Sequence, residues 1–259
     1  MPNNNTRSTS IQSVENACTV LETLMRRNDT SVSDLSKEIN LSKSTIHNHL
    51  KTLAEAGYVD KQRGEYQLGL QCLTLGGYAR DHHSLYQTAR SAVDHLAEET
   101  GELAMVTTHD RGKSVYLYQV RGADAVTTDS YLGIRLPLHC TATGKAMLAY
   151  MDRDQAEQIL SQEGLPEQTE NTITDPEQLF EEFDQIRDRR VAFDDEERIL
   201  GMRGIASPVI ERGSGAVIGA LSITGPISRV EGTRFTEEIP ELIRRDAEML
   251  EVNIRYSLK

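Results

Sequence analysis

Residues 31–56 read SVSDLSKEINLSKSTIHNHLKTLAEA. Apolar side chains recur at helical spacing in both halves of this stretch, which predicts two short amphipathic helices, each with one buried face. Ser42 stands between them as a predicted N-cap, and Gly57 supplies a left-handed stop after the second helix. The apolar positions are Val32, Leu35 and Ile39 in the first helix and Ile46, Leu50 and Leu53 in the second. This pattern predicts a helix-turn-helix.

The second predicted helix presents cations and short hydrogen-bonding side chains near its N-terminus, where a recognition helix touches base edges and phosphates of double-stranded DNA. The candidate DNA-contacting residues of this helix are Ser42, Lys43, Ser44, Thr45, His47, Asn48 and Lys51. An ordinary helical hairpin with a polar surface is the alternative.

Two β-prone runs at residues 58–61 and 65–68 flank Gln62-Arg63-Gly64 and predict a hairpin, the wing of a winged helix. Arg63 at the tip is a further candidate because it can approach a phosphate or the minor groove. A first helix from about Ser13 would close a three-helix core. Its apolar positions are Val14, Ala17, Cys18, Leu21, Leu24 and Met25.

A net charge of −12 over 259 residues is unfavourable for DNA binding when taken as a sum, but the charge is unevenly distributed. Residues 1–80 carry nine Lys and Arg against eight Asp and Glu, a net of +1, which leaves −13 for the rest. Phosphate contact depends on local cations, so an acidic second domain is compatible with it. Seven Lys, 21 Arg and 40 acidic residues also indicate a salt-rich cytoplasm, with an ordinary acidic bacterial protein as the alternative.

Cysteine usage and hydropathy exclude several classes of protein. Cys18, Cys72 and Cys140 are odd in number and lack a metal-ligand spacing, so we expect three buried thiols and no disulfide framework or zinc finger. No apolar run approaches the roughly 20 residues that cross a bilayer, and no apolar signal segment precedes the first helix. We therefore expect a cytoplasmic protein without membrane, metal or cofactor.

The order of predicted elements indicates two domains. Residues 1–10 are predicted to be a disordered tail, 11–69 a winged-helix domain, 70–100 a linking helix interrupted near Gly76-Gly77, and 101–259 a second domain. In the second domain, strands are predicted at 103–109, 114–120, 125–131, 204–210 and 216–224, and helices at 141–151, 152–160, 176–190 and 236–256. This order is typical of an α+β domain whose helices pack on an antiparallel sheet.

The chain resembles the IclR family of transcriptional regulators from about Ser13 to Pro226. The stretches that carry the resemblance are SVENA at 13–17, LSKSTIH at 41–47, LAEAGYV at 53–59, YQLG at 66–69, LPLH at 136–139, GKA at 144–146, DDEE at 194–197, ASPV at 206–209 and SITGP at 222–226. The resemblance implies a winged helix, a GAF-like effector-binding domain that also serves oligomerisation, and homodimers or homotetramers on operator DNA. At His47-Asn48 many relatives have a His or Tyr followed by Arg, so the base sequence recognised is not transferable.

The resemblance also implies an effector pocket in the second domain, for a small organic, sugar-derived or aromatic acid. Position 204 often holds a cysteine in relatives, so Gly204 is expected to enlarge the pocket. The implied effector-binding residues are Leu136, Ala142, Thr143, Asp194, Met202, Gly204, Ser222 and Thr224.

Three other candidate sites compete with this interpretation. Residues 140–145 are similar to a phosphate loop, but Ala146 replaces the magnesium-binding hydroxyl, so we expect either a carboxylate at the helix N-terminus or simple capping by Thr141. Asp194 is either a pocket acceptor or a solvated acid. An enzyme that uses Asp194, Glu196 or His139 with an accessory winged helix is the alternative function, although no nucleophile, metal set or cofactor loop is evident.

Overall fold

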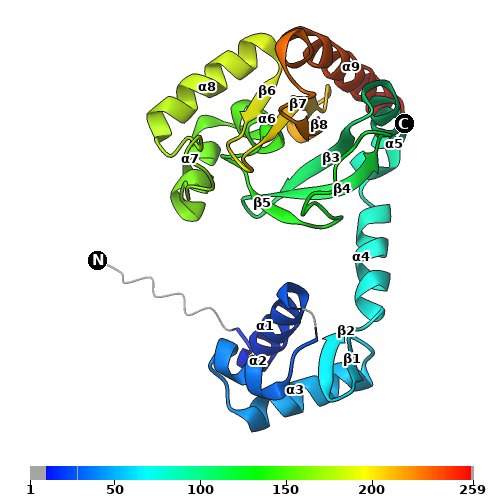
Figure 1. Ribbon diagram of the computed structural model, residues 1–259, viewed down its shortest axis with the longest axis vertical. Coiled ribbons are helices and arrows are strands. Elements are labelled where there is room, and N and C mark those ends of the chain that lie inside the picture. Colours follow the sequence, from blue (N-terminus) through cyan, green and yellow to red (C-terminus); the bar gives the residue numbers. More distant parts are fainter. Residues whose placement is uncertain (1–9, 28, 258–259) are drawn as a thin grey trace. The chain divides into compact units, whose positions relative to one another are not determined.

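The computed structural model describes residues 10–27 and 29–257, so the predicted tail at residues 1–10 lies outside the described residues except for Ser10. The chain divides into two compact units, residues 1–79 and 80–259, which are described separately (Figure 1).

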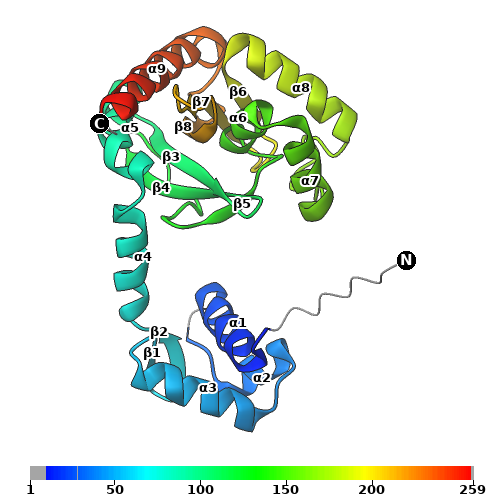
Figure 2. The ribbon, with the colours of Figure 1, turned by 180° about the vertical axis from the view of Figure 1, so that it is seen from behind.

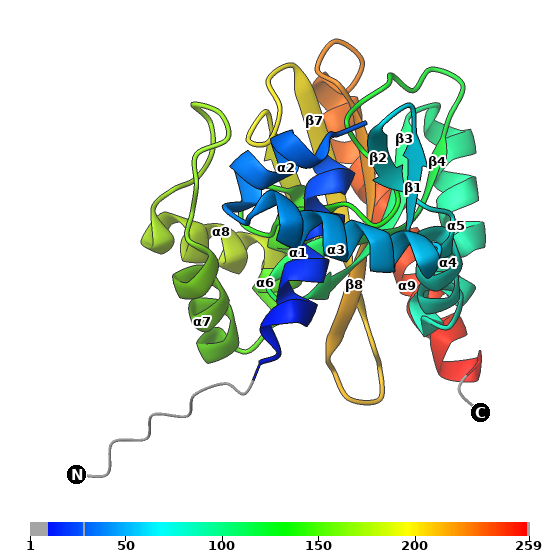
Figure 3. The same ribbon diagram turned by 90° about the horizontal axis from the view of Figure 1, so that it is seen from below.

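The N-terminal unit contains the predicted helix-turn-helix and wing. Its helices are α1 (Gln12–Arg26), α2 (Val32–Ile39) and α3 (Lys43–Glu55), followed by the antiparallel strands β1 (Val59–Gln62) and β2 (Glu65–Leu68). Figure 3 shows the three helices with the hairpin beside α3. A single core joins them, formed by Val20, Leu24, Leu35, Ile46, Leu50, Val59 and Tyr66.

Helix α1 differs from the prediction in the face that it buries. Val20, Thr23 and Leu24 enter the core, whereas Val14 and Met25 are exposed. The expectation of three buried cysteines is also wrong, since Cys18 is exposed, Cys72 is partly buried and only Cys140 is buried. A single stripe of three or four residues per two turns is enough to close so small a core.

The predicted interruption at Gly76-Gly77 is wrong. Helix α4 (Gln71–Asp81) passes through both glycines, because a glycine inside a helix costs only about 1 kcal/mol relative to alanine. The break lies at His83, which is extended with φ −82° and ψ 119° and precedes α5 (Ser84–Thr100). Helix α5 then buries Leu85, Ala89, Val93 and Leu96 against the sheet of the C-terminal unit.

The C-terminal unit is built on one antiparallel sheet in the order β5-β4-β3-β8-β7-β6. Its strands are β3 (Leu103–Asp110), β4 (Lys113–Arg121), β5 (Arg135–Pro137), β6 (Ala192–Asp195), β7 (Met202–Ile210) and β8 (Val217–Pro226). The central strands β3, β7 and β8 are almost wholly buried, as expected for strands covered on both faces.

Helices cover both faces of this sheet (Figures 1 and 2). Helix α5 and the closing helix α9 (Ile239–Ser257), which follows a π-helical turn at Arg234–Glu238, pack on one face. Helix α6 (Ala142–Tyr150) lies on the other face, beneath α7 (Arg153–Glu163) and α8 (Pro176–Arg189). The predicted α+β class with helices on an antiparallel sheet is confirmed.

The strand predicted near residues 125–131 is absent, and this segment is irregular. Side chains of β4 hold it in place of a backbone ladder. Gln119 Nε2 donates to the Ser130 carbonyl at 3.4 Å, and Arg121 Nη1 donates to Thr127 Oγ1 at 3.1 Å. We call residues 122–134 the strap.

Candidate DNA-binding surface and ligand pocket

The N-terminus of α3 is fixed by Ser42, as predicted. Its Oγ accepts the Thr45 N–H at 3.1 Å and lies 2.8 Å from Thr45 Oγ1. The two hydroxyls hydrogen-bond with each other, and that of Ser42 also caps the helix. Both side chains therefore serve first to fix the start of α3. Beyond the cap, Ile46 and Leu50 are fully buried and set the rotation of the helix.

The remaining candidate residues of α3 lie on one exposed face. Lys43, Ser44, His47, Asn48 and Lys51 are all exposed. Lys51 Nζ is 3.9 Å from the carboxylate of Glu55, a surface pair of two largely exposed side chains. Such a pair contributes little to stability, so Lys51 can exchange its partner for a phosphate at small cost.

The wing ends in a tight turn at Arg63 and Gly64. Their φ angles are 52° and 93°, and left-handed values at both central residues match the twist of the two strands. The turn places Arg63 at the exposed tip. Lys61 on β1 lies over the Tyr66 ring at 5.2 Å from its centroid, and adds a cation to the wing that the sequence analysis did not select.

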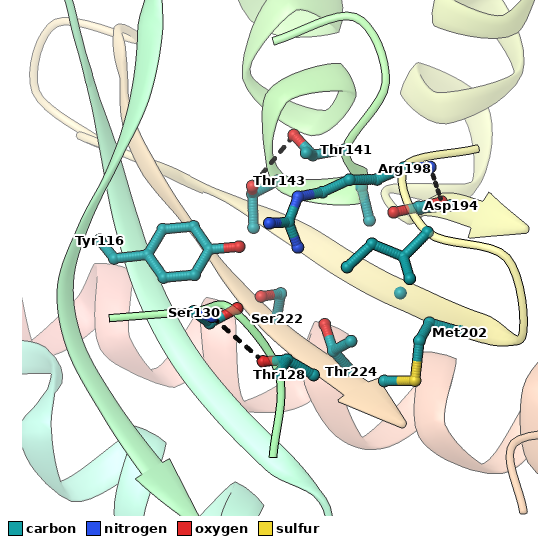
Figure 4. A pocket seen from close by; sticks show the side chains of 13 residues that line it. Tyr116, Thr128, Ser130, Thr141, Thr143, Asp194, Arg198, Met202, Ser222 and Thr224 are labelled. Atoms are coloured by element: carbon teal, nitrogen blue, oxygen red, sulfur yellow. Dashed lines mark hydrogen bonds between the residues drawn. The ribbon is translucent and has the colours of Figure 1, made fainter. Parts of the chain in front are cut away.

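The C-terminal unit holds a pocket between the N-terminus of α6, the β6–β7 segment, strands β4 and β8, and the strap (Figure 4). About 430 Å³ between its walls is free of protein atoms, including space at the open mouth. The lining residues are Tyr116, Thr128, Ser130, Thr141, Ala142, Thr143, Asp194, Arg198, Ile199, Met202, Gly204, Ser222 and Thr224.

The structure brings seven of the eight implied effector residues together in this pocket. Leu136 is the exception, since it packs on the small cluster of Leu103, Met105, Tyr116 and Ile134. The antiparallel register explains the grouping, because Gly204 lies opposite both Asp194 and Thr224.

Sequence reasoning missed six lining residues. Thr141 directly precedes the selected Ala142, and Arg198 and Ile199 lie between the selected Asp194 and Met202, so extending these segments along the chain would have found all three. The others belong to β4 and the strap, whose approach to the pocket depends on a pairing that the sequence did not reveal. These are Tyr116, Thr128 and Ser130.

Hydroxyl groups and one helix end dominate the polar lining. Thr141 caps α6 by accepting the Gly144 N–H at 3.1 Å, which leaves the N–H groups of Ala142 and Thr143 without partners inside the helix. Ser222 Oγ is buried without a hydrogen-bond partner among the described residues. A ligand carboxylate at the positive helix end and a ligand hydroxyl near Ser222 would satisfy these groups.

Asp194 is placed in the pocket wall by β6 and by its own hydrogen bonds. Its Oδ1 accepts the Glu197 N–H at 2.9 Å and the Arg198 N–H at 3.2 Å. Burial and the neighbouring Glu197 raise the pKa of Asp194 to about 7, against the opposing effect of Lys145 and the two N–H groups. Near neutral pH this carboxyl can therefore either donate or accept a hydrogen bond.

The other titratable groups near the pocket are poor catalysts. Burial raises the pKa of both the Tyr116 phenol and the Cys140 thiol to about 12, which keeps both protonated at neutral pH. His139 is buried outside the lining, its Nε2 lies 3.1 Å from the Pro166 carbonyl, and burial lowers its pKa. The described residues contain no cluster that could hold a metal ion, and no described helix is long and apolar enough to cross a membrane.

Family models match both units of the chain. The IclR helix-turn-helix domain matches residues 13–63, and the bacterial transcriptional regulator IclR C-terminal domain matches residues 76–252. The chain belongs to the IclR family. It shares with that family the helix-turn-helix domain that binds DNA and the C-terminal effector domain.

Individual IclR relatives align over nearly the whole chain. The probable HTH-type transcriptional regulator ArcR of Halobacterium salinarum is 32% identical over 255 residues, 97% of each chain. The Thermotoga maritima IclR crystal structure has a TM-score of 0.76 and 26% identity, covering 95% of this chain and 99% of its own. An IclR homologue from Microbacterium hydrocarbonoxydans, crystallised with 4-hydroxybenzoate, has the same fold, with a TM-score of 0.80, 24% identity, and coverage of 94% and 99%. These relatives support a regulator and give no support to the enzyme alternative.

Proposed function

We propose that this regulator reads operator DNA with the exposed face of α3 and the wing, and that a small hydroxylated carboxylic acid in the pocket changes its DNA affinity. The observation that carries the effector class is the pocket lining. It combines a helix N-terminus, a carboxyl with a pKa of about 7 and six hydroxyl side chains besides the capping Thr141.

The first-turn N–H groups of Ala142 and Thr143 would bind the effector carboxylate, since a helix N-terminus favours negative charge. Asp194, Ser222 and Thr224 would then meet hydroxyl or carbonyl groups of the effector. The 4-hydroxybenzoate in the Microbacterium structure is also a hydroxylated carboxylic acid. Apolar atoms of Tyr116, Ala142, Ile199 and Met202 share the lining with the hydroxyl groups, so the pocket suits the carbon skeleton of an aliphatic or an aromatic hydroxy acid.

Base recognition is assigned to Asn48 and His47, and phosphate contact to Lys43, Ser44, Lys51 and Arg63. These assignments rest on exposure beside a helix N-terminus and at a wing tip. Ser42 and Thr45 would support the contact by fixing the helix end.

The proposed assembly on DNA is a homodimer or a pair of dimers. The N-cap residue Ile11 and helix α1 together present an exposed apolar stripe that also contains Val14, Cys18 and Met25, with the three-and-four spacing of a helix-pairing seam. A second copy of this chain suits the stripe, because two recognition helices about 34 Å apart are needed for successive major grooves. Light scattering should give at least twice the mass of one chain, and Val14→Glu should reduce it.

The proposed setting is a salt-rich cytoplasm. The excess of acidic residues and of arginine over lysine supports it, as does the Halobacterium salinarum relative. DNA affinity would then have to persist at salt concentrations that weaken phosphate contacts.

The function is tested by a thermal-shift panel of carboxylic acids with and without hydroxyl groups, including gluconate, glycerate, 4-hydroxybenzoate and benzoate. Acids that stabilise the protein are then added to a fluorescence anisotropy titration of DNA selected from a random pool. We expect a hydroxy acid to stabilise the protein and to shift DNA affinity by at least fivefold. Stabilisation without any change in DNA affinity would contradict the proposal.

A further inference from the structure

Arg198 places a cation inside the pocket and pairs it with the chain's own strap. Figure 4 shows the guanidinium group in the pocket beside Thr143 and on the side that the Tyr116 hydroxyl faces, and the Arg198 side chain is only 12% exposed. Its charge opposes the upward shift that burial causes in the pKa of both Tyr116 and Cys140. Asp129 on the strap neutralises this charge.

Only one nitrogen of the Arg198 guanidinium group takes part in the pair with Asp129. Both carboxylate oxygens of Asp129 lie 2.7 Å from the same nitrogen, Nη2. Arginine holds a carboxylate best through two nitrogens at once, in a planar fork. The Asp129 side chain is 62% exposed, so returning it to water costs little. A ligand carboxylate that accepts hydrogen bonds from two guanidinium nitrogens at once would therefore replace Asp129 favourably.

The same pair links the segment between β6 and β7 to the strap. Thr128 and Ser130 on either side of Asp129 line the pocket. The hydrogen bonds from β4 side chains to residues 126–130 are 3.1 to 3.4 Å long, against 2.7 Å for the pair. Because Arg198 and two residues of the strap form part of the lining, a ligand that enters the pocket meets both partners of this link.

We propose that Arg198 is a specificity-determining residue that binds the effector carboxylate together with the N-terminus of α6, and that Asp129 occupies Arg198 when the pocket is empty. An anionic effector then competes with the chain's own carboxylate and releases the strap as it binds. This inference rests on the proposed effector pocket but is independent of DNA binding.

The test uses acetate as the simplest carboxylate and acetamide with sodium chloride as its neutral match at equal ionic strength. Thermal stability of the full chain is titrated for the wild type and for Asp129→Asn, Arg198→Gln and Arg198→Lys. Asp195→Asn is the matched control, because Asp195 is also an exposed acid (51%) on a largely buried arginine, Arg203 (17%), but lies outside the pocket. Hydrogen exchange of residues 122–134 is measured on the same proteins without ligand.

We expect Asp129→Asn to bind acetate about tenfold more tightly than the wild type, and Arg198→Gln about tenfold more weakly, with Arg198→Lys between them. Hydrogen exchange of the strap should be faster in Asp129→Asn and Arg198→Gln than in the wild type, and unchanged in Asp195→Asn. The inference is overturned if Asp129→Asn and Asp195→Asn behave alike, or if acetate binds none of the proteins. Carboxylate binding at Arg198 with no effect on DNA would instead refute the proposed function and leave this inference standing.

Discussion

Lys145 of α6 and Glu197 of the segment after β6 form a buried ion pair behind the pocket wall. Their side chains are only 2% and 8% exposed. Glu182 lies 3.8 Å from the same Lys145 nitrogen and is itself held by Arg189 at 2.7 Å. The pair joins the helix that offers N–H groups to the ligand to the segment that carries Asp194 and Arg198.

Breaking this pair should be costly. Lys145→Met leaves the Glu197 carboxylate buried without its cation, so we expect a loss of about 3–5 kcal/mol in the free energy of unfolding of the C-terminal unit. Lys113→Met is the control, because Lys113 pairs with Glu163 at a site where the side chains are 30% and 32% exposed. That change should cost less than about 1 kcal/mol. Similar losses in chemical denaturation of the two variants would show that Lys145 is only a packing residue.

The titration of Asp194 should be visible in stability. Its pKa of about 7 lies above the ordinary value of 3.8, so the folded chain holds this proton more tightly than the unfolded chain. The group therefore stabilises the folded state most below pH 4, and this contribution is lost as pH rises to 7. Asp194→Asn mimics the protonated form at every pH. The free energy of unfolding of the variant minus that of the wild type should therefore increase by at least about 1 kcal/mol as pH rises from 4.5 to 8. A constant difference across that range would contradict the assignment.

Substitution by alanine should have opposite effects on stability at two glycines. A Cβ at Gly76 meets nothing within 4 Å, so Gly76→Ala should stabilise the chain by up to about 1 kcal/mol through the helix propensity of α4. A Cβ at Gly144 would lie 2.1 Å from the Leu138 carbonyl oxygen, so Gly144→Ala should destabilise it and displace the start of α6. Thermal unfolding of both variants checks the pair. Destabilisation by Gly76→Ala would mean that α4 does break there.

The salt dependence of DNA binding should distinguish residues that contact phosphates from residues that contact bases. Lys43→Ala is expected to weaken DNA binding and to reduce the slope of log affinity against log salt by about one unit, as loss of one phosphate contact requires. Asn48→Ala should instead cost about 1–3 kcal/mol on the preferred sequence and little on others. Anisotropy titrations at several salt concentrations measure both. An unchanged slope for Lys43→Ala, or an equal loss on all sequences for Asn48→Ala, would reject the respective role.

The sequence allowed prediction wherever the signal is local. The capping hydroxyl of Ser42, the stop at Gly57 and the turn at Arg63-Gly64 depend on neighbours within a few residues, and each lies where predicted. The pocket set came from the family resemblance, and strand register explains why Asp194, Gly204 and Thr224 meet. Residues 125–131 were wrongly predicted to form a strand, because their β-prone composition does not reveal that side chains of β4 hold this segment in place of a backbone ladder. Leu136 was misplaced for a similar reason, since only the pairing of β5 with β4 decides which face it occupies.

The most direct test of a ligand-responsive regulator is to measure both halves of its coupling. DNA affinity is determined with and without a saturating hydroxy acid, and affinity for that acid is determined with and without saturating DNA. Because coupling between two sites is reciprocal, the two ratios must be equal, and we expect both to lie between about 5 and 150. A DNA affinity that stays the same when the pocket is saturated would contradict the account.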